Sequence, residues 1–390
     1  MFRYFLFLAA LSACFVAHPA AAAPAAAVPT AAASAAAAPA AAALAAAANP
    51  TVTETVKLPA VCASGTQKIR ESGFVSIGGI EQWVAINGAH CNNPLLLILH
   101  GGPGNTMSPY ADTIYTGWEQ HFTLVQWDQR GAGKTYGKQP LAADGALSLE
   151  QMTADGVQLA QYLTRRFGQK KIILLGGSWG SVLGVHMVKT RPDLFHAWVG
   201  VSQMVNHRDN LIASYTRMLE RARTAGDSVT VTALDALGMP PWTNPRHFGV
   251  LRRAIRKYEA KVTDPAPASW WVPAADYASP QALADYEAGE EYSFLQFIGL
   301  KGDGMFSRVD LPHLGMIFAV PVFMVQGEQD LLTTPEVARR YFDGIKAPAK
   351  DMLMVPRTGH DPNPALLAAQ WRVLNDWVLP LVVAARETGR

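Results

Sequence analysis

The sequence predicts an α/β protein in which a doubly wound, mostly parallel sheet is interrupted by a helical insertion. Short, continuously apolar runs alternate with longer segments of helical pattern, which is typical of parallel strands covered on both faces by helices. Glycine or charged residues bound the apolar runs. The alternation stops between about residues 203 and 318 and resumes near the C-terminus. That gap predicts a helical cap inserted between two core strands.

The first predicted strands form a hairpin. Lys68–Ser76 and Ile80–Asn87 flank the turn dipeptide Gly78-Gly79. Continuous apolar runs then predict buried strands at 95–99, 122–127, 171–175, 197–202 and 321–326. Helical patterns occupy 149–167 and 181–190.

The N-terminus has the pattern of an export signal. Arg3 precedes an apolar run, 4–16, that is too short to span a bilayer, and small residues follow over 17–23. The tetrapeptide ending at Cys14 resembles a bacterial lipobox, so a lipid anchor is the alternative. We favour ordinary cleavage near 21–23, because the apolar run continues past Cys14. A secreted or periplasmic protein is therefore expected.

The domain organisation follows from these shifts in composition. Residues 23–50 are almost all Ala with interspersed Pro, which breaks an alanine helix and predicts a linker. The predicted segments are a signal peptide at 1–22, the linker at 23–50, the first part of the core at 51–202, the cap at 203–318 and the second part of the core at 319–390.

Two cysteines remain once the signal is removed, Cys62 and Cys91. An even pair in an exported chain is a disulfide candidate. The hairpin turn sets a register in which residues near 66 face residues near 91, so both cysteines lie at its open end. We expect them to be bonded.

Charge excludes one class of partner. The formal net charge of +2 gives no electrostatic footprint for nucleic acid. Gly131–Thr135 ends like a phosphate-binding loop, but the earlier glycine that this motif requires is replaced by Asp128. We expect no nucleotide, metal or other cofactor, and no transmembrane span. The oligomeric state is left open.

A nucleophile motif follows the predicted strand at 171–175. Gly176-x-Ser178-x-Gly180 stands between a strand and a helix, the context in which this pattern forms a sharp turn that projects the serine hydroxyl. Side chains at 176 and 180 would collide with the neighbouring strand and helix. Ser178 is therefore the predicted nucleophile.

A serine hydroxyl needs a base, and the base needs an acid to orient it. His360 follows Gly359 in a loop near the C-terminus, after a strand-like segment. Asp330 follows the strand at 321–326, where a residue lies on the ligand face of an open α/β sheet. Glu328 is the competing acid. The predicted triad is Ser178, Asp330 and His360.

Developing negative charge on the substrate oxygen also needs donors. The backbone N–H of Trp179, directly after the nucleophile, is the first candidate. The second comes from the glycine-rich loop His100–Gly104, whose backbone is free to approach a substrate closely. We choose Gly102 over Gly101.

Together these motifs resemble the proline iminopeptidase (prolyl aminopeptidase) family of α/β-hydrolases. The segments that carry the resemblance are His100–Gly104, Asp128–Gly133, Gly176–Gly180, Gly327–Asp330 and Gly359-His360. The resemblance implies an α/β-hydrolase core with a helical cap, an acyl-enzyme route without a cofactor, and release of an N-terminal proline from short peptides.

The family resemblance also implies that glutamates of the cap hold the free α-amino group of the peptide. The best acidic cluster in the cap is Glu287, Glu290 and Glu291, which could equally form a solvated helix face. Two functions therefore stay open. One is an aminopeptidase for proline or another small residue, and the other is an esterase, lactonase or amidase with the same triad.

Overall fold

The structure is a computed structural model that describes residues 62, 67–140 and 146–387. The predicted export signal, the Ala/Pro-rich linker and Cys14 lie outside the described residues.

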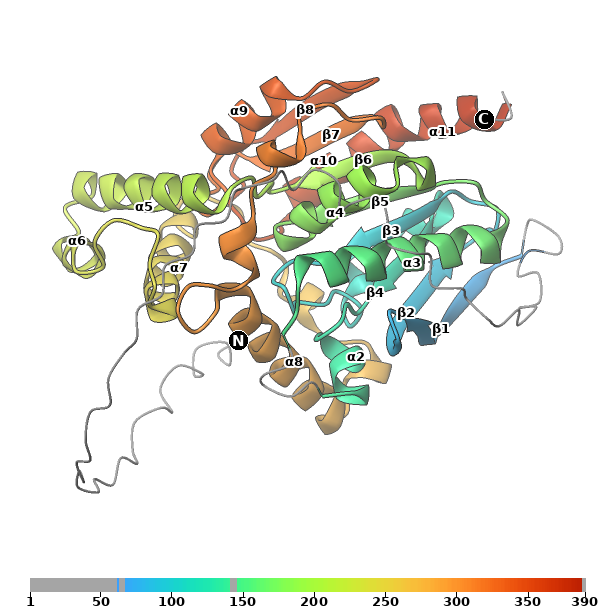
Figure 1. Cartoon of the computed structure of the whole chain (residues 1–390), viewed down its shortest axis with the longest axis horizontal. Coiled ribbons are helices and arrows are strands. Elements are labelled where there is room, and N and C mark those ends of the chain that lie inside the picture. The colour runs from blue at the N-terminus through green and yellow to red at the C-terminus, as the bar shows by residue number, and fades with distance from the viewer. Residues whose placement is uncertain (1–61, 63–66, 141–145, 388–390) are drawn as a thin grey trace, which may run out of the picture. The chain divides into compact units, whose positions relative to one another are not determined.

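Eight strands form one mixed sheet in the order β1-β2-β4-β3-β5-β6-β7-β8 (Figure 1). β2 pairs antiparallel with β1 and β4, and all other neighbours are parallel. The doubly wound, mostly parallel sheet expected from the sequence is thereby confirmed. The strand bounds are β1 Ile69–Ile77, β2 Ile80–Gly88, β3 Leu95–Leu99, β4 Thr123–Trp127, β5 Ile172–Gly177, β6 Phe195–Val201, β7 Val322–Gly327 and β8 Lys350–Val355.

Helices cover both faces of the sheet because its central strands are apolar on both faces. Alternate residues of β3 enter different clusters, with Leu97 in one and Leu96 in the other. The first cluster contains residues of α3 (Leu149–Phe167), α4 (Trp179–Thr190) and α9 (Pro335–Gly344). The second contains residues of α1 (Ala111–Ile114), α10 (Pro364–Arg372) and α11 (Leu379–Glu387).

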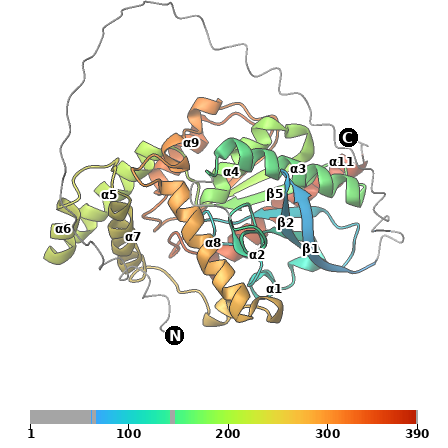
Figure 2. The ribbon, with the colours of Figure 1, turned by 60° about the horizontal axis from the view of Figure 1, so that its bottom comes forward.

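Residues 203–318 contain four α-helices and none of the eight named strands. The helices are α5 (His207–Thr224), α6 (Ser228–Asp235), α7 (Pro245–Glu259) and α8 (Pro280–Ile298). The first three share a small apolar cluster that includes Leu331 from the loop after β7. α8 packs across α2 (Gly133–Lys138), as both ribbon views show (Figures 1 and 2). This region therefore contacts the core at more than one place.

The β1–β2 hairpin carries the predicted disulfide. Its register pairs Ile69 with Gly88, and the Cys91 N–H donates to the Gln67 carbonyl at 2.9 Å. The ladder thus extends to the open end of the hairpin. Cys62 and Cys91 are disulfide-bonded with Cα atoms 5.7 Å apart, which confirms the predicted pairing.

Replacing both cysteines by serine is expected to lower the free energy of unfolding. The bond closes a loop between positions 29 residues apart, and the lost constraint on a chain of that length corresponds to about 3 to 4 kcal/mol. β1 is an edge strand, separated from β5 by three strands, so kcat/KM should stay within about twofold of wild type. Urea unfolding and steady-state kinetics of the double variant measure both quantities. A loss of activity that accompanies the loss of stability would contradict the expectation that the disulfide does not affect the active site.

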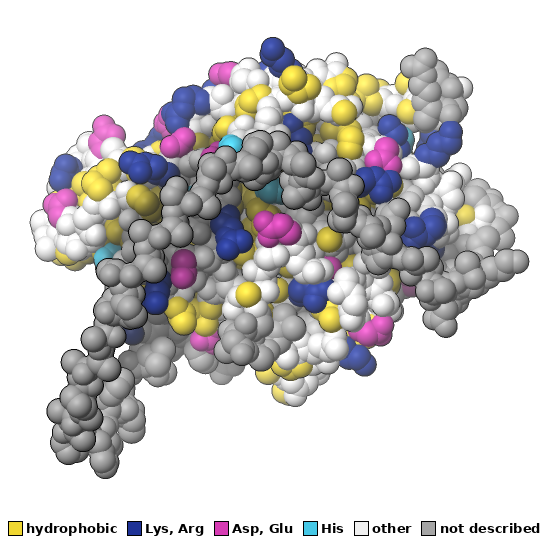
Figure 3. Space-filling model, viewed as in Figure 1, with side chains coloured by type: hydrophobic (Ala, Val, Ile, Leu, Met, Phe, Trp, Pro, Cys, Tyr) yellow, Lys and Arg dark blue, Asp and Glu magenta, His cyan; other side chains and the backbone are white. Residues whose placement is uncertain are grey.

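Neither a bilayer-spanning helix nor a candidate metal cluster was found in the described part of the chain. On the face drawn in Figure 3, basic and acidic side chains are interspersed and do not gather into a patch of one sign.

Candidate active site

Ser178 occupies a strained turn between β5 and α4. Its backbone has φ 53° and ψ −117°, and it directly precedes the helix. A positive φ is unusual for a residue with a Cβ, and such strain persists only where the surroundings enforce it. The residue is half-buried.

Two glycines allow this turn to form. A Cβ on Gly176 would come within 2.4 Å of the Gly180 carbonyl oxygen, and one on Gly180 within 2.3 Å of the Leu99 carbonyl oxygen. Such contacts would push α4 away from β3 and β5. The steric reason given for both glycines on the sequence alone is therefore confirmed.

His360 links Ser178 to Asp330. Its Nε2 lies 3.0 Å from the Ser178 hydroxyl oxygen, and its Nδ1 lies 3.0 Å from Oδ2 of Asp330. The His360 side chain is 6% exposed and the Asp330 side chain is fully buried. The structure thus brings together the three residues of the predicted triad, from three separate strand ends.

Asp330 is held as an ionised acceptor. Oδ1 accepts the backbone N–H groups of Leu332 and Thr333, while Oδ2 accepts the Thr333 hydroxyl at 2.6 Å and the Gln326 amide at 3.1 Å. Burial by itself raises the pKa of Asp330, but the His360 ring and the Thr333 hydrogen bonds outweigh it, so the pKa lies below its usual value. The competing acid, Glu328, is exposed and does not contact His360 in the hydrogen bonds of the described residues.

The glycine-rich loop after β3 lies against the nucleophile. A Cβ on Gly101 would lie 3.4 Å from the Ser178 Cβ, and Gly102 has φ 106°, a conformation that favours glycine. Trp179 is the first residue of α4, where a backbone N–H has no acceptor within the helix. Trp179 follows Ser178 directly, and Gly102 is the next residue after Gly101 in the loop. Their predicted roles as oxyanion donors stay predictions.

The Asp128-Gln129 pair holds this loop in place, a role that the sequence did not reveal. Asp128 accepts hydrogen bonds from the Thr106 and Ser108 hydroxyls, and from the Lys134 N–H at 2.9 Å. Gln129 accepts the indole N–H of Trp179 at 3.0 Å and donates to the carbonyl of His100 at 3.3 Å. The buried pair therefore joins the glycine-rich loop to the start of α4.

The three predicted substrate-binding glutamates lie on α8 but differ in their surroundings. Glu287 and Glu291 are exposed, whereas Glu290 is half-buried. At Glu290 the helix passes the glycine-rich loop so closely that a Cβ on Gly104 would meet the Glu290 Cα at 2.8 Å. The Arg256 guanidinium lies within electrostatic range of Glu290. Glu290 is therefore the one of these three glutamates that is half-buried beside the glycine-rich loop, and its role toward a substrate stays a prediction.

Glu259 is a further buried carboxylate that the sequence analysis did not single out. It ends α7 and is 5% exposed, and burial followed by the charge of Asp330 raises its pKa to about 7. The spacing of buried residues along α7 could have revealed Glu259 from the sequence. Leu251, Ile255 and Tyr258 form the buried stripe of α7, and Glu259 continues it eight residues after Leu251.

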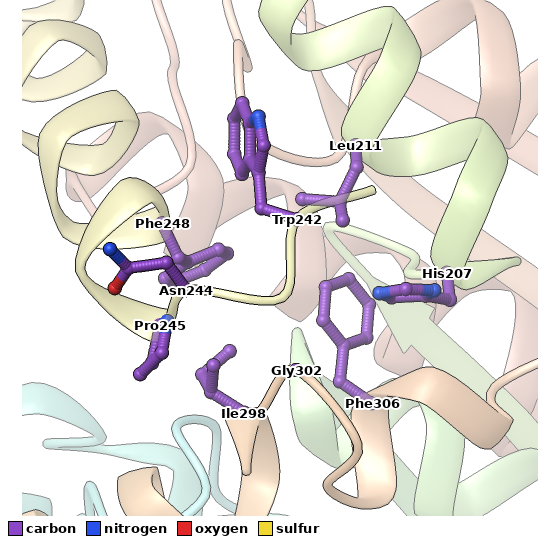
Figure 4. A pocket seen from close by; sticks show the side chains of 9 residues that line it. All are labelled: His207, Leu211, Trp242, Asn244, Pro245, Phe248, Ile298, Gly302 and Phe306. Carbon is purple, nitrogen blue, oxygen red and sulfur yellow. The ribbon is translucent and has the colours of Figure 1, made fainter. Parts of the chain in front are cut away.

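A pocket in the cap lies away from these residues. Side chains from α5, the start of α7 and the segment around η5 (Met305–Arg308) line it, among them His207, Trp242 and Phe306 (Figure 4). None of the predicted site residues lines it. It therefore does not mark the substrate site.

The sheet topology and the strained strand–turn–helix at Ser178 define the class of protein as an α/β-hydrolase. Solved structures agree on the fold. The proline iminopeptidase of Mycobacterium smegmatis superposes with a TM-score of 0.58 at 20% identity, covering 81% of this chain and all of that one.

Sequence comparisons specify the family. A family model described as serine aminopeptidase, S33, matches residues 91–266. A probable aminopeptidase of Bacillus subtilis, YbaC, is 30% identical over 306 residues, which are 75% of this chain and 92% of that one. A probable proline iminopeptidase of Streptomyces coelicolor is 26% identical over 299 residues, covering 72% and 88%. The chain belongs to the proline iminopeptidase-like family of α/β-hydrolases.

Proposed function

We propose that this protein is an exported serine aminopeptidase that releases proline, or another small residue, from the N-terminus of short peptides through an acyl-enzyme. The observation that carries the proposal is the hydrogen-bonded series from Ser178 through His360 to Asp330. The relatives named as aminopeptidases and proline iminopeptidases support the substrate class. The signal-like N-terminus and the disulfide support export.

The proposed first half-reaction forms the acyl-enzyme. His360 Nε2 takes the Ser178 proton while Oγ attacks the carbonyl carbon of the first residue. The carbonyl oxygen becomes an oxyanion, which the N–H groups of Gly102 and Trp179 stabilise. The C–N bond then breaks, and the imidazolium gives its proton to the departing amine. Asp330 keeps the imidazole in the required tautomer.

The second half-reaction reverses these roles with water. His360 removes a proton from water, and the hydroxide attacks the ester carbonyl carbon. The bond to Ser178 Oγ breaks, and His360 returns the proton to that oxygen. Proline leaves as the free amino acid, so no cofactor enters either step.

Dependence on a free amine tests the substrate class. We expect prolyl-p-nitroanilide to be hydrolysed with a kcat/KM at least about a hundredfold above that of its N-acetylated form, because acetylation removes the charged amine that the half-buried Glu290 is proposed to bind. Glu290→Gln should raise KM for the free-amine substrate, and the exposed Glu287→Gln provides the matched control. Equal hydrolysis of both substrates would contradict the aminopeptidase.

An esterase, lactonase or amidase is the second candidate. The positive charge of Arg256 acts on Glu290 and favours this candidate, because a carboxylate whose charge is partly offset by a nearby guanidinium is a weaker ligand for an amine. Under this alternative, p-nitrophenyl esters are hydrolysed efficiently and prolyl amides are not.

We expect kcat/KM to fall as the pH drops below about 6 to 7, because a protonated imidazole cannot accept the serine proton. The lowered pKa of Asp330 keeps that carboxylate ionised throughout this range, so the acid does not set this limb of the profile. A kcat/KM profile from pH 5 to 8 with a stable substrate measures the effect. A flat profile would argue against a histidine base.

A further inference from the structure

Glu259 connects the cap to both loops that carry the base and the acid. Its Oε1 accepts the Leu331 N–H at 2.7 Å, and its Oε2 accepts the His360 N–H at 3.1 Å. Leu331 follows Asp330 directly in the chain. One carboxylate therefore spans the backbones of the two loops, next to both members of the His–Asp pair.

The acid loop is attached to the cap by more than this carboxylate. The Leu331 side chain is fully buried in the cluster formed by α5, α6 and α7. Its carbonyl accepts the hydroxyl of Ser214, on α5, at 2.6 Å. Both backbone groups and the side chain of Leu331 thus lie against the cap, so cap helices determine where the loop with Asp330 sits.

The base loop is shaped around the same carboxylate. A Cβ on Gly359 would come within 2.6 Å of Glu259 Oε2, so only glycine allows the carboxylate to reach the His360 N–H. The two loops also meet directly, since the Gln329 N–H donates to the Thr358 carbonyl at 2.9 Å. Glu259 lies where the loops converge.

We propose that Glu259 is a positioning residue that holds the Asp330 and His360 loops in the register needed for proton transfer from Ser178. This inference rests on the proposed serine hydrolase. With the carboxylate 5% exposed and both its oxygens bonded to backbone N–H groups, Glu259 acts on the triad loops and not on the substrate. The charged groups that face it are Asp330, His360 and Arg252, and Arg256 is near.

Glu259→Gln is the principal test, because an amide keeps the size of the carboxyl but presents N–H where one backbone donor needs an acceptor. We expect kcat to fall about 10- to 100-fold with KM within about twofold, the size of effect that a misplaced catalytic group produces. The loss should be equal for prolyl-p-nitroanilide and for p-nitrophenyl acetate, which has no amine.

The pH dependence of kcat/KM is a second measurement, and a general loss of structural order would not change its shape. Burial and the charge of Asp330 raise the pKa of Glu259 to about 7, so Glu259 takes up a proton, and no longer accepts both N–H groups, over the acid limb of kcat/KM; Glu259→Gln should therefore make that limb less steep. Gly359→Ala provides an independent variant, because its methyl group displaces the carboxylate while leaving Glu259 in the sequence. It should reproduce the loss of kcat, and it carries the test if Glu259→Gln does not fold.

Asp264→Asn is the matched control. Asp264 also ties the cap region to the loop before His360, through an exposed ion pair with Arg357 at 2.6 Å, but it does not touch the His360 or Leu331 backbone. Its kcat should stay within about twofold of wild type. Labelling of Ser178 with a fluorophosphonate, carried to its end point, measures the fraction of each variant that is folded. Every rate is then divided by that fraction.

Two results would overturn the inference. One is an unchanged kcat in both Glu259→Gln and Gly359→Ala. The other is a raised KM with kcat retained on the prolyl substrate alone, which would make Glu259 an amine ligand. Failure of the wild-type enzyme to react with the fluorophosphonate would instead refute the serine hydrolase itself.

Discussion

Ser178→Ala is expected to lower kcat/KM by at least about a thousandfold while the protein stays folded. The hydroxyl oxygen is the atom that His360 Nε2 contacts at 3.0 Å, and alanine leaves the base with no nucleophile to activate. Steady-state kinetics with prolyl-p-nitroanilide and with an ester measure the loss.

The fold should tolerate this change, because the Ser178 backbone and not its hydroxyl makes the turn. Its N–H donates to the Val201 carbonyl, and its own carbonyl accepts the Ser181 N–H and hydroxyl. Thr190→Ala is the control, because it removes an exposed hydroxyl from the end of the same helix, α4. Residual activity above about a tenth of wild type in Ser178→Ala would place the nucleophile elsewhere.

Asp330→Asn is expected to lower kcat by about 10³- to 10⁴-fold, because an asparagine amide in this position favours the wrong imidazole tautomer. An amide nitrogen at Oδ2 would also face the Gln326 amide, which donates to that position. Oδ1 would keep its hydrogen bonds from the Leu332 and Thr333 N–H groups, so the loop should retain its turn. KM should change little.

Glu328→Gln is the control for Asp330→Asn. Glu328 lies in the same loop and was the competing candidate, but its side chain is exposed. Its activity should match wild type within about twofold. The opposite pattern, with Glu328→Gln inactive and Asp330→Asn active, would reassign the acid.

Much of the core was predictable from local pattern. Mostly apolar runs predicted β3 as it is observed and β4, which also contains Thr123 and Gln126, to within one residue, since strands buried on both faces are rich in apolar residues. The turn dipeptide Gly78-Gly79 fixed the register that brings Cys62 and Cys91 together. The order serine, acid, histidine and the strand-end positions of these residues predicted which side chains meet.

The tertiary structure decided what depends on contacts between distant segments. Glu287, Glu290 and Glu291 look alike in the sequence, but only the packing of α8 against the glycine-rich loop half-buries Glu290. In the sequence, Asp128 and Gln129 contributed only to the family resemblance. The fold shows that they lie between that loop and α4.

Glu259 is a second residue whose contacts could not be predicted from the sequence. Its place on the buried stripe of α7 marks it as an anomaly, because an unpaired carboxylate is costly to bury. Its partners, however, are backbone N–H groups 72 and 101 residues further along the chain. Every residue other than proline has such a donor, so no sequence pattern distinguishes the two that Glu259 binds. Local patterns determined the strands and the nucleophile turn, and the packing of the cap on the core decided how the base and acid loops are held.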